Sequence, residues 1–359
     1  MSIRKRILSL CWSGALLLAA CAAPLTTTPR PSPAVIPTRT PALAAAPSNT
    51  PVEQNTPVVQ NTPVEQNTPV EQNTPVHQNT PTASVTDDAG VLAAFPTPSP
   101  SPEFVYDPND PLSWQKLPVL PVLNPAMEEV FARGQQLGNN PRAFSKIGDC
   151  ETSTAYFLMD FDLGPKNYRL AQYVDLQDVI TYFAGSFGRT SLAAKPGFSA
   201  VSALSSLQAD SGKCQPGEIP LSCEYRVHRP ALALIMFGTN DVHTGRKTFE
   251  KYMRQIIEIS LNQGIIPVLV TKADNLEGDF SINALIAGLA DEYQLPLWNL
   301  WAAMQVVPNS GLQADGIHLT YARNFYDDPA SFQFGWPVRN LSALQALQAL
   351  WKGLSASAP

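Results

Sequence analysis

The pattern of apolar and polar positions divides the 359-residue chain into three parts. Residues 1–20 place three basic side chains ahead of a short apolar stretch, which is typical of an export signal and too short to span a bilayer comfortably. Residues 21–120 are dominated by Pro, Thr, Gln, Asn and Ala and cannot build a core. Residues 121–359 have a globular composition and are long enough for one α/β core.

Short apolar runs in the third part predict strands. Residues 231–237 are continuously apolar and end at Gly238, which suits a parallel strand that is buried on both faces. Weaker runs predict further strands at 143–147, 190–194, 265–271 and 295–300.

Apolar side chains at helical spacing lie between these runs. Residues 248–262 place Phe249, Met253 and Ile256 on one side of a helix. Because strands and helices alternate, the sequence predicts a flavodoxin-like three-layer α/β/α fold with a mostly parallel sheet of about five strands. In such sheets, ligands bind beyond the carboxyl ends of the strands. The other predicted helices span 174–183, 199–207, 281–293 and 341–351.

The second part carries a six-residue repeat, Asn-Thr-Pro-Val-Glu-Gln with variants, from Asn55 to Pro81. Proline at every sixth position blocks helix formation and removes the donors that a sheet needs. We therefore expect residues 21–120 to be a disordered, extended linker, which we interpret as a stalk between a membrane and the folded domain.

Charge and side-chain clusters argue against several functions. The chain has 24 Lys and Arg against 30 Asp and Glu, a net charge of −6, and no basic run interleaved with aromatics, so nucleic acid is not an expected partner. No His/Cys cluster has metal-ligand spacing, and no Gly-rich phosphate loop occurs. The sequence predicts neither a metal nor a cofactor, and it leaves the oligomeric state open.

The cysteines indicate an exported protein. Leu18-Ala19-Ala20-Cys21 resembles the lipobox of bacterial lipoproteins, which implies cleavage before Cys21, a lipid on its thiol and a place on the outer face of the cell membrane; an ordinary signal with an incidental Cys is the alternative. Cys214 and Cys223, nine apart in a loop rich in Pro, Gly and Ser, are expected to form a disulfide there. Cys150 is then left without a partner, either buried and inert or retained for its reactivity.

Three short motifs follow or close strand-like runs: Gly148-Asp149-Cys150, Gly238-Thr239-Asn240-Asp241 and Asp315-Gly316-Ile317-His318. They supply a nucleophile, an amide donor, and an imidazole with a carboxylate three residues before it. A carboxylate so placed can meet the ring, fix its tautomer and stabilise the imidazolium. The amide of Asn240 can donate to negative charge that develops on a carbonyl oxygen. Nucleophilic acyl transfer needs these groups and little else.

These motifs resemble those of the SGNH (GDSL-type) hydrolases, over about residues 143–330. The resemblance implies that Cys150 replaces the family's nucleophilic Ser, with His318 as the base and Asp315 as its partner. It also implies an oxyanion hole formed by Asn240 and by Gly197, in Pro196-Gly197-Phe198-Ser199, which is the weakest of the four matches. The implied activity is ester hydrolysis or acyl transfer on an acylated glycan or lipid of the cell envelope.

Other side chains near the ends of strands are candidate substrate contacts: Asp149, Asp241, His243 and Lys272. Asp149 and Asp241 are also expected to brace their loops, and a polar capping loop is the alternative for Lys272. Three tryptophans are candidates for lining a sugar or acyl groove, with core packing as the alternative, above all for the first: Trp298, Trp301 and Trp336.

Cys150 leaves several interpretations open. The first is an active thiol-based hydrolase, and the second is an inactive SGNH-like domain that is retained for glycan binding or as a scaffold. A redox role or a misaligned motif is a third. The retention of Asn240, Asp315 and His318 favours activity, because a pure binder does not need all three.

Overall fold

The computed structural model describes residues 106–356. The predicted export signal at 1–20, the expected lipid attachment at Cys21 and most of the predicted linker at 21–120 therefore lie outside the described residues. Within the range 106–356, no helix combines the length and the apolar character that crossing a membrane requires.

Four strands form the main sheet, and every pairing between them is parallel. The strand order is β1-β3-β4-β5, and a parallel bridge joins Ala194 to Gly148 at the free edge of β1. With the segment around Ala194 counted, the order is that of a flavodoxin-like sheet. A second, two-stranded sheet pairs β2 with β6. The strands are β1 (Asn140–Gly148), β2 (Tyr168–Arg169), β3 (Pro230–Met236), β4 (Ile266–Val270), β5 (Leu297–Trp298) and β6 (Asn324–Phe325).

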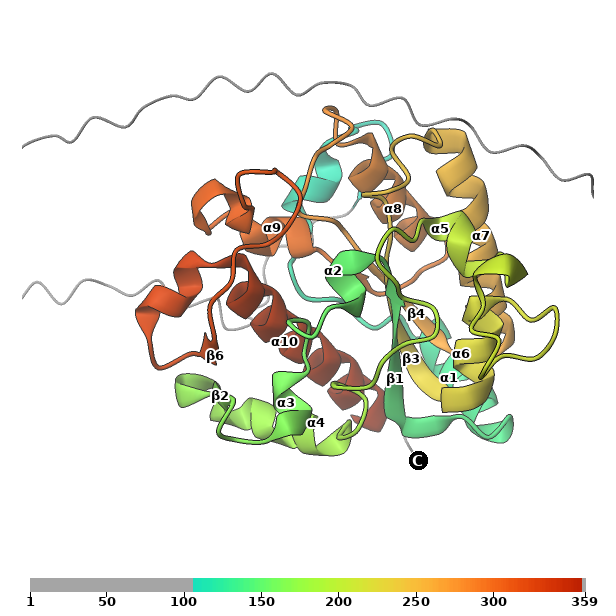
Figure 1. Cartoon of the computed structure of the whole chain (residues 1–359), viewed down its shortest axis with the longest axis horizontal. Coiled ribbons are helices and arrows are strands. Elements are labelled where there is room, and N and C mark those ends of the chain that lie inside the picture. The colour runs from blue at the N-terminus through green and yellow to red at the C-terminus, as the bar shows by residue number, and fades with distance from the viewer. Residues whose placement is uncertain (1–105, 357–359) are drawn as a thin grey trace, which may run out of the picture. The chain divides into compact units, whose positions relative to one another are not determined.

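Helices cover both faces of the main sheet, as Figure 1 shows, with α10 on one side and α1, α6 and α7 on the other. The α-helices are α1 (Ala126–Gln136), α2 (Cys150–Ser153), α3 (Asp160–Leu163), α4 (Gln177–Tyr182), α5 (Ala200–Ala203), α6 (Pro220–His228), α7 (Arg246–Asn262), α8 (Ser281–Glu292), α9 (Leu300–Met304) and α10 (Gly335–Ala356). The short 3-10 helices are η1 (Ser113–Lys116), η2 (Ala171–Leu176), η3 (Ser206–Gln208), η4 (Pro308–Gly311) and η5 (Pro329–Gln333).

The core lies between the sheet and these two helical layers. All seven residues of β3 are buried, as a continuous apolar run in a central parallel strand requires. In α7, Phe249, Met253, Ile256 and Ile257 form the buried side. The predicted three-layer α/β/α fold with a mostly parallel sheet is confirmed.

One predicted strand is reduced to the single bridge at Ala194. The backbone N–H of Leu192 donates to the Glu224 carboxylate (2.7 Å), and that of Ala193 donates to the Ser191 hydroxyl (3.0 Å). Because these donors are taken by side chains, residues 190–194 do not form a continuous ladder with β1. The main sheet accordingly has four strands rather than about five.

Candidate active site

The loop after β1 places Cys150 at the start of α2. The Asp149 carboxylate accepts a hydrogen bond from the Glu151 N–H (3.1 Å) and so caps this short helix. Gly148 leaves no room for a side chain, because a Cβ there would collide with the Met236 carbonyl and the Thr152 side chain. The close approach of β1 and β3 therefore fixes the turn from which Cys150 projects.

The structure brings the predicted nucleophile and base together. Cys150 Sγ lies 3.7 Å from His318 Nε2, although the two residues are 168 positions apart in the chain. His318 Nδ1 lies 2.7 Å from Asp315 Oδ2. With Nδ1 protonated and donating to Asp315, the lone pair of Nε2 faces the sulfur, which is the arrangement that proton removal requires.

Asp315 is itself held by the backbone of its loop. Its Oδ1 accepts from the N–H groups of Ile317 (2.9 Å) and His318 (3.0 Å). The hydrogen bond with His318 is the main cause that lowers the pKa of Asp315 to about 2, and it raises the pKa of His318 above the usual value of 6.5. Asp315 is therefore ionised at neutral pH and stabilises the imidazolium form of His318.

The surroundings of the Cys150 thiol disfavour its thiolate form, unlike those of a reactive cysteine. Burial, followed by the negative charges of Asp149 and Glu151, raises the pKa of the Cys150 thiol to about 11. Burial also raises the pKa of Asp149 to about 7. The sulfur is therefore protonated at neutral pH, and it would have to lose its proton to act as a nucleophile.

The two predicted oxyanion donors, Asn240 and Gly197, are linked through a single hydrogen bond to the loop that carries Gly197. The Asn240 Nδ2 group donates to the Phe198 carbonyl (2.8 Å), one residue beyond Gly197. Gly197 is exposed, and its φ of 78° is a conformation that a glycine adopts at little cost. This loop continues from the bridge at Ala194, where the Lys195 N–H donates to the Gly148 carbonyl (3.3 Å). The Asn240 amide thus contacts the loop that carries Gly197, and this loop is tied to the strand before Cys150.

Cys150 and His318 open into a cavity of about 590 Å³. The disulfide predicted between Cys214 and Cys223 is formed, and Asp210 and Lys213, from the loop next to it, belong to the cavity wall. The lining residues are Cys150, Glu151, Ser153, Thr154, Tyr156, Thr190, Ser191, Leu192, Ala194, Lys195, Pro196, Asp210, Lys213, Gln313, His318, Leu319 and Trp336.

Comparison with known proteins gives structural likenesses only. No protein-family model matches the chain, and no curated protein matches it. Among solved structures, a GDSL-like lipase from Bacteroides thetaiotaomicron is similar at 17% identity and a TM-score of 0.36, over 62% of this chain and 98% of that one. A catalytic mutant of an acetylxylan esterase from Geobacillus stearothermophilus is similar at 14% identity and a TM-score of 0.38, over 58% and 95%. At these scores the likeness assigns neither an activity nor site residues.

The four candidate substrate contacts do not line the cavity. Lys272 is 1% exposed and forms ion pairs with Asp274 and Glu277, each at 2.6 Å. Asp241 is buried and accepts from the N–H groups of Ala200 (3.0 Å) and Gly238 (3.1 Å). The side chains of Lys272 and Asp241 therefore brace their loops and are not available as the substrate contacts that the sequence suggested.

Asp149 and His243 differ in their exposure to solvent. Asp149 is 1% exposed and caps α2, so its side chain is not available to a substrate. His243 is exposed and is not among the residues that line the cavity, as Gly197 and Asn240 also are not, and its role as a substrate contact stays a prediction. Of the three tryptophans, Trp336 lines the cavity and Trp298 is fully buried, whereas Trp301 packs edge-on against Trp114 with ring centroids 4.9 Å apart.

The sequence reasoning did not find Glu151 or Tyr156. Both lie within six residues of Cys150 and both line the cavity. The sequence signal for Glu151 was its position directly after the predicted nucleophile Cys150. For Tyr156 no periodicity separates it from an ordinary loop aromatic.

Proposed function

We propose that the protein is an ester hydrolase of the SGNH type in which Cys150 is the nucleophile. The observation that carries the proposal is the relay of contacts from Cys150 Sγ to His318 Nε2 (3.7 Å) and from His318 Nδ1 to Asp315 Oδ2 (2.7 Å). Three side chains of these types at such distances are what proton transfer from a nucleophile requires.

In the proposed first step, the sulfur of Cys150 bonds to the ester carbonyl carbon while its proton passes to His318 Nε2. The carbonyl oxygen becomes an oxyanion, which the Cys150 and Gly197 N–H groups and the Asn240 amide stabilise; each such donor contributes about 2.7–4 kcal/mol at the transition state. The carbon–oxygen bond to the alcohol then breaks, and His318 returns the proton to the leaving alcohol. A thioester between the acyl group and Cys150 remains.

In the second step, water attacks the thioester while His318 takes a proton from it. The carbon–sulfur bond breaks, the carboxylic acid leaves, and the thiol regains its proton. If an alcohol takes the place of water, the same step is an acyl transfer. Because the pKa of Cys150 is raised to about 11, His318 has to remove the proton during attack rather than before it.

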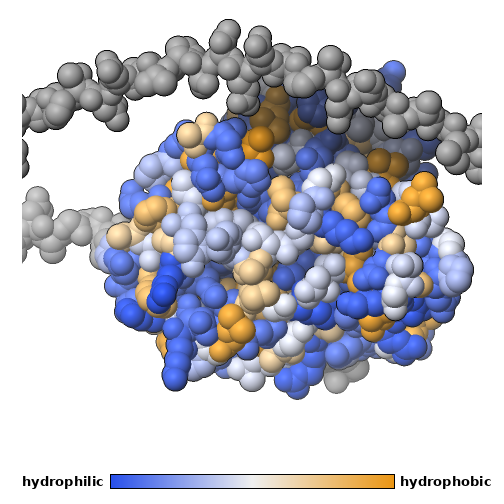
Figure 2. All heavy atoms as spheres, in the orientation of Figure 1, coloured by the Kyte–Doolittle hydropathy of each residue, from blue (hydrophilic) through white to orange (hydrophobic). Residues whose placement is uncertain are grey.

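The exposed aromatic side chains beside the cavity favour an acylated glycan over a lipid ester as the substrate. Tyr156 and Tyr321 are about half exposed, with ring centroids 4.6 Å apart, and Tyr156 is also next to Trp336 (5.8 Å). Such rings present an apolar face and a hydroxyl group, which matches a pyranose ring that has apolar faces and polar edges. Figure 2 shows hydrophilic and hydrophobic residues intermixed on the face turned to the viewer.

A non-catalytic binding domain is the second candidate, and two observations favour it. The thiol is protonated at neutral pH, and the Asn240 amide already donates to the Phe198 carbonyl. In this alternative the cavity binds an acylated glycan without cleaving it.

Turnover of p-nitrophenyl acetate by the mature chain separates the two candidates. Hydrolysis predicts turnover that Cys150→Ala and His318→Ala abolish, with Lys251→Ala, on the exposed side of α7, as a control that retains it. Cys150→Ser is expected to keep measurable activity, because the base is arranged to deprotonate a neutral group. Wild-type turnover no faster than that of Cys150→Ala rejects the enzyme.

A second assay addresses the substrate class. Tyr156→Ala is expected to raise KM for an acetylated oligosaccharide while leaving KM for p-nitrophenyl acetate nearly unchanged. Faster turnover of a long-chain p-nitrophenyl ester than of the acetylated oligosaccharide contradicts the glycan preference.

The proposal includes a location, which rests on the sequence alone. We propose export, cleavage before Cys21 and a lipid anchor that holds the domain outside the cell membrane. In detergent phase separation, the wild-type protein should partition into the detergent phase and Cys21→Ser into the aqueous phase. Equal partitioning of the two proteins rejects the anchor.

A further inference from the structure

Glu151 connects the two loops that carry the proposed nucleophile and base. Its side chain is buried beneath the cavity, directly after Cys150. Its Oε1 accepts from the backbone N–H of Leu319 (3.4 Å), the residue that follows His318. Its Oε2 lies 3.2 Å from the Arg339 guanidinium, on α10. One carboxylate on α2 therefore contacts two segments that are distant from it in the sequence.

The side chain of Arg339, the ion-pair partner of Glu151, is held in place by its own contacts. It is 1% exposed, its guanidinium lies over the Phe157 ring at 4.2 Å, and its second terminal nitrogen contacts Met236 Sδ at 3.4 Å. Met236 pairs with Gly148, the residue at the end of β1. The ion pair is thus held against the same strand ends that place Cys150.

The contacts from Cys150 through His318 to Asp315 are exposed to solvent and need a support of this kind. The side chains of His318 and Asp315 are 47% and 45% exposed, so packing alone does not hold the imidazole over the sulfur. Their loop is closed by its own bonds, including that from the Gln313 N–H to the His318 carbonyl (2.8 Å). The contact from Leu319 to Glu151 ties this loop to α2, and a shift of about 1 Å between reacting groups can cost about 100-fold in rate.

We propose that Glu151 is a positioning residue, which holds the base loop at a fixed distance from the nucleophile and is itself held by Arg339. This inference rests on the proposed hydrolase function and deepens it. Glu151 touches neither the reacting carbonyl nor a leaving group in this role, and it acts through the backbone of Leu319 and through its charge.

The charge of Glu151 acts on both members of the relay. It contributes to the raised pKa of His318, after the Asp315 hydrogen bond, and to the raised pKa of Cys150, after burial and Asp149. The titratable and charged groups that interact with Glu151 are Arg339 from α10, His318, Asp274, Asp149 and Cys150. Removal of its charge should lower the pKa of both the imidazole and the thiol.

Two substitutions at Glu151 separate its hydrogen bond from its charge. Glu151→Ala removes both, and we expect kcat to fall about 10- to 100-fold with KM changed less than about threefold. Glu151→Gln keeps an oxygen that can accept from Leu319 N–H, so the folded protein should recover most of kcat while shifting the pH–rate profile to lower pH, although loss of the buried ion pair with Arg339 should lower its stability. Glu292→Gln, an exposed site on α8, is the matched control and should behave as wild type.

The pKa of His318 in the full mature chain gives a readout that needs no turnover. His318 is assigned in the NMR spectrum through His318→Ala, and the resonance of His228 serves as an internal reference. Glu151→Gln should lower the pKa of His318 and leave that of His228 unchanged.

Three results overturn the inference. These are wild-type kcat in Glu151→Ala, a Glu151→Gln protein as impaired in kcat as Glu151→Ala, or an unchanged pKa of His318 in Glu151→Gln. If Glu151→Ala does not fold, Glu151→Gln and the titration decide the question. If the wild-type protein has no turnover, the proposed function fails, whereas the titration still shows whether Glu151 acts on His318.

Discussion

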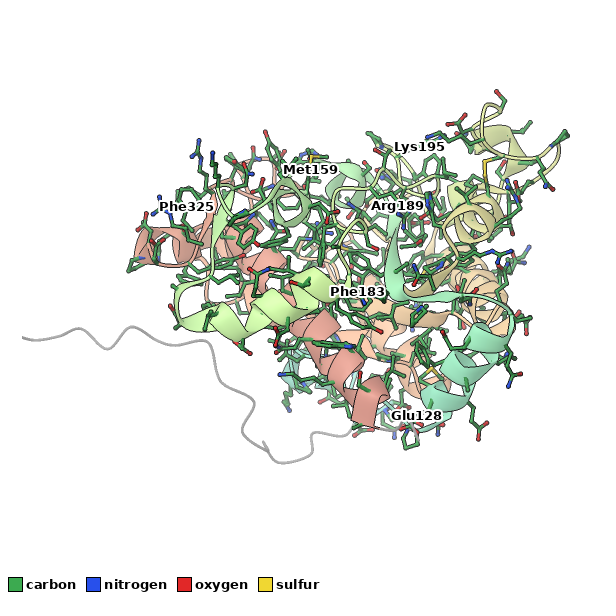
Figure 3. The ribbon with its side chains drawn as sticks, turned by 90° about the horizontal axis from the view of Figure 1, so that it is seen from below. Glu128, Met159, Phe183, Arg189, Lys195 and Phe325 are labelled. Carbon is green, nitrogen blue, oxygen red and sulfur yellow. A yellow bond between two sulfur atoms is a disulfide. The ribbon has the colours of Figure 1, made fainter. Side chains whose placement is uncertain are left out.

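Glu224 offers a direct test of how the wall of the cavity is held. Its carboxylate is fully buried in α6 and has four partners, among which Arg189 lies beside β1 in Figure 3. The partners are Ser145 Oγ (2.7 Å), Arg189 (2.6 Å), the Leu192 N–H (2.7 Å) and His228 Nε2 (3.6 Å). Because Leu192 lines the cavity, this carboxylate joins the core to the active-site wall.

Glu224→Gln keeps the shape of the side chain and removes its charge. The Arg189 side chain is only 18% exposed, so the substitution leaves a poorly solvated cation without its partner. Removal of one member of a buried ion pair costs about 3–5 kcal/mol, and the retained hydrogen bonds put the expected loss at the lower end of that range. For a domain of this size that corresponds to a fall in Tm of roughly 6–12 °C.

A surface ion pair supplies the matched control. Glu250 pairs with Arg254 at 2.9 Å on α7, and both side chains are about a third exposed. Glu250→Gln should cost no more than about 1 kcal/mol, because solvent screens such pairs. Urea unfolding followed by tryptophan fluorescence measures both free energies. An equal loss of stability in the two variants refutes the argument that Glu224 organises the core.

Three further predictions concern the relay and the disulfide. Ester turnover should rise with pH through the pKa of His318, because the neutral imidazole takes the proton. That pKa is raised above 6.5, so the midpoint of the pH–rate profile should lie above 6.5. Asp315→Asn should lower this midpoint, because the hydrogen bond with Asp315 is the main cause of the raised pKa. Alkylation of Cys150 by iodoacetamide should accelerate about tenfold per pH unit from pH 7 to 9, because the pKa of the thiol is about 11, and a rate that levels off below pH 8 contradicts this. Replacing Cys214 and Cys223 together by Ala should destabilise the fold by about 2–3 kcal/mol, and an unchanged thermal unfolding curve rejects the expectation.

The sequence predicted the relay because its parts follow recognisable motifs. Cys150 and Asn240 come shortly after β1 and β3, and the carboxyl ends of parallel strands meet at one edge of a sheet. The position of His318 followed from its spacing to Asp315 and from the family resemblance. Helices with one apolar side were predicted well, as for α7, whereas α10 begins six residues earlier than expected. The first part of α10 is buried on all sides and so has no amphipathic pattern.

Side-chain partners that are distant in the sequence escaped prediction. Lys272 follows a strand, which suggested a substrate contact, but Asp274 and Glu277 fold back onto it and the loop closes over all three. Residues 190–194 have the composition of a strand, yet Glu224 takes the donor of Leu192. Periodicity reports which face of an element is buried, and it carries no information about which distant charge satisfies a backbone group.

The protonation states of the relay connect the nucleophile to its surroundings. The pKa of the Cys150 thiol is raised to about 11, so the thiol is protonated at neutral pH and the resting site does not hold the thiolate of a reactive cysteine site. The carboxylates of Asp149 and Glu151 that disfavour the thiolate also favour the imidazolium, since both contribute to the raised pKa of His318. The same surroundings therefore suppress the free thiolate and assist the base once the proton has moved. In the proposed hydrolysis, such a site ties deprotonation of Cys150 to its attack on a carbonyl, as a hydroxyl nucleophile requires.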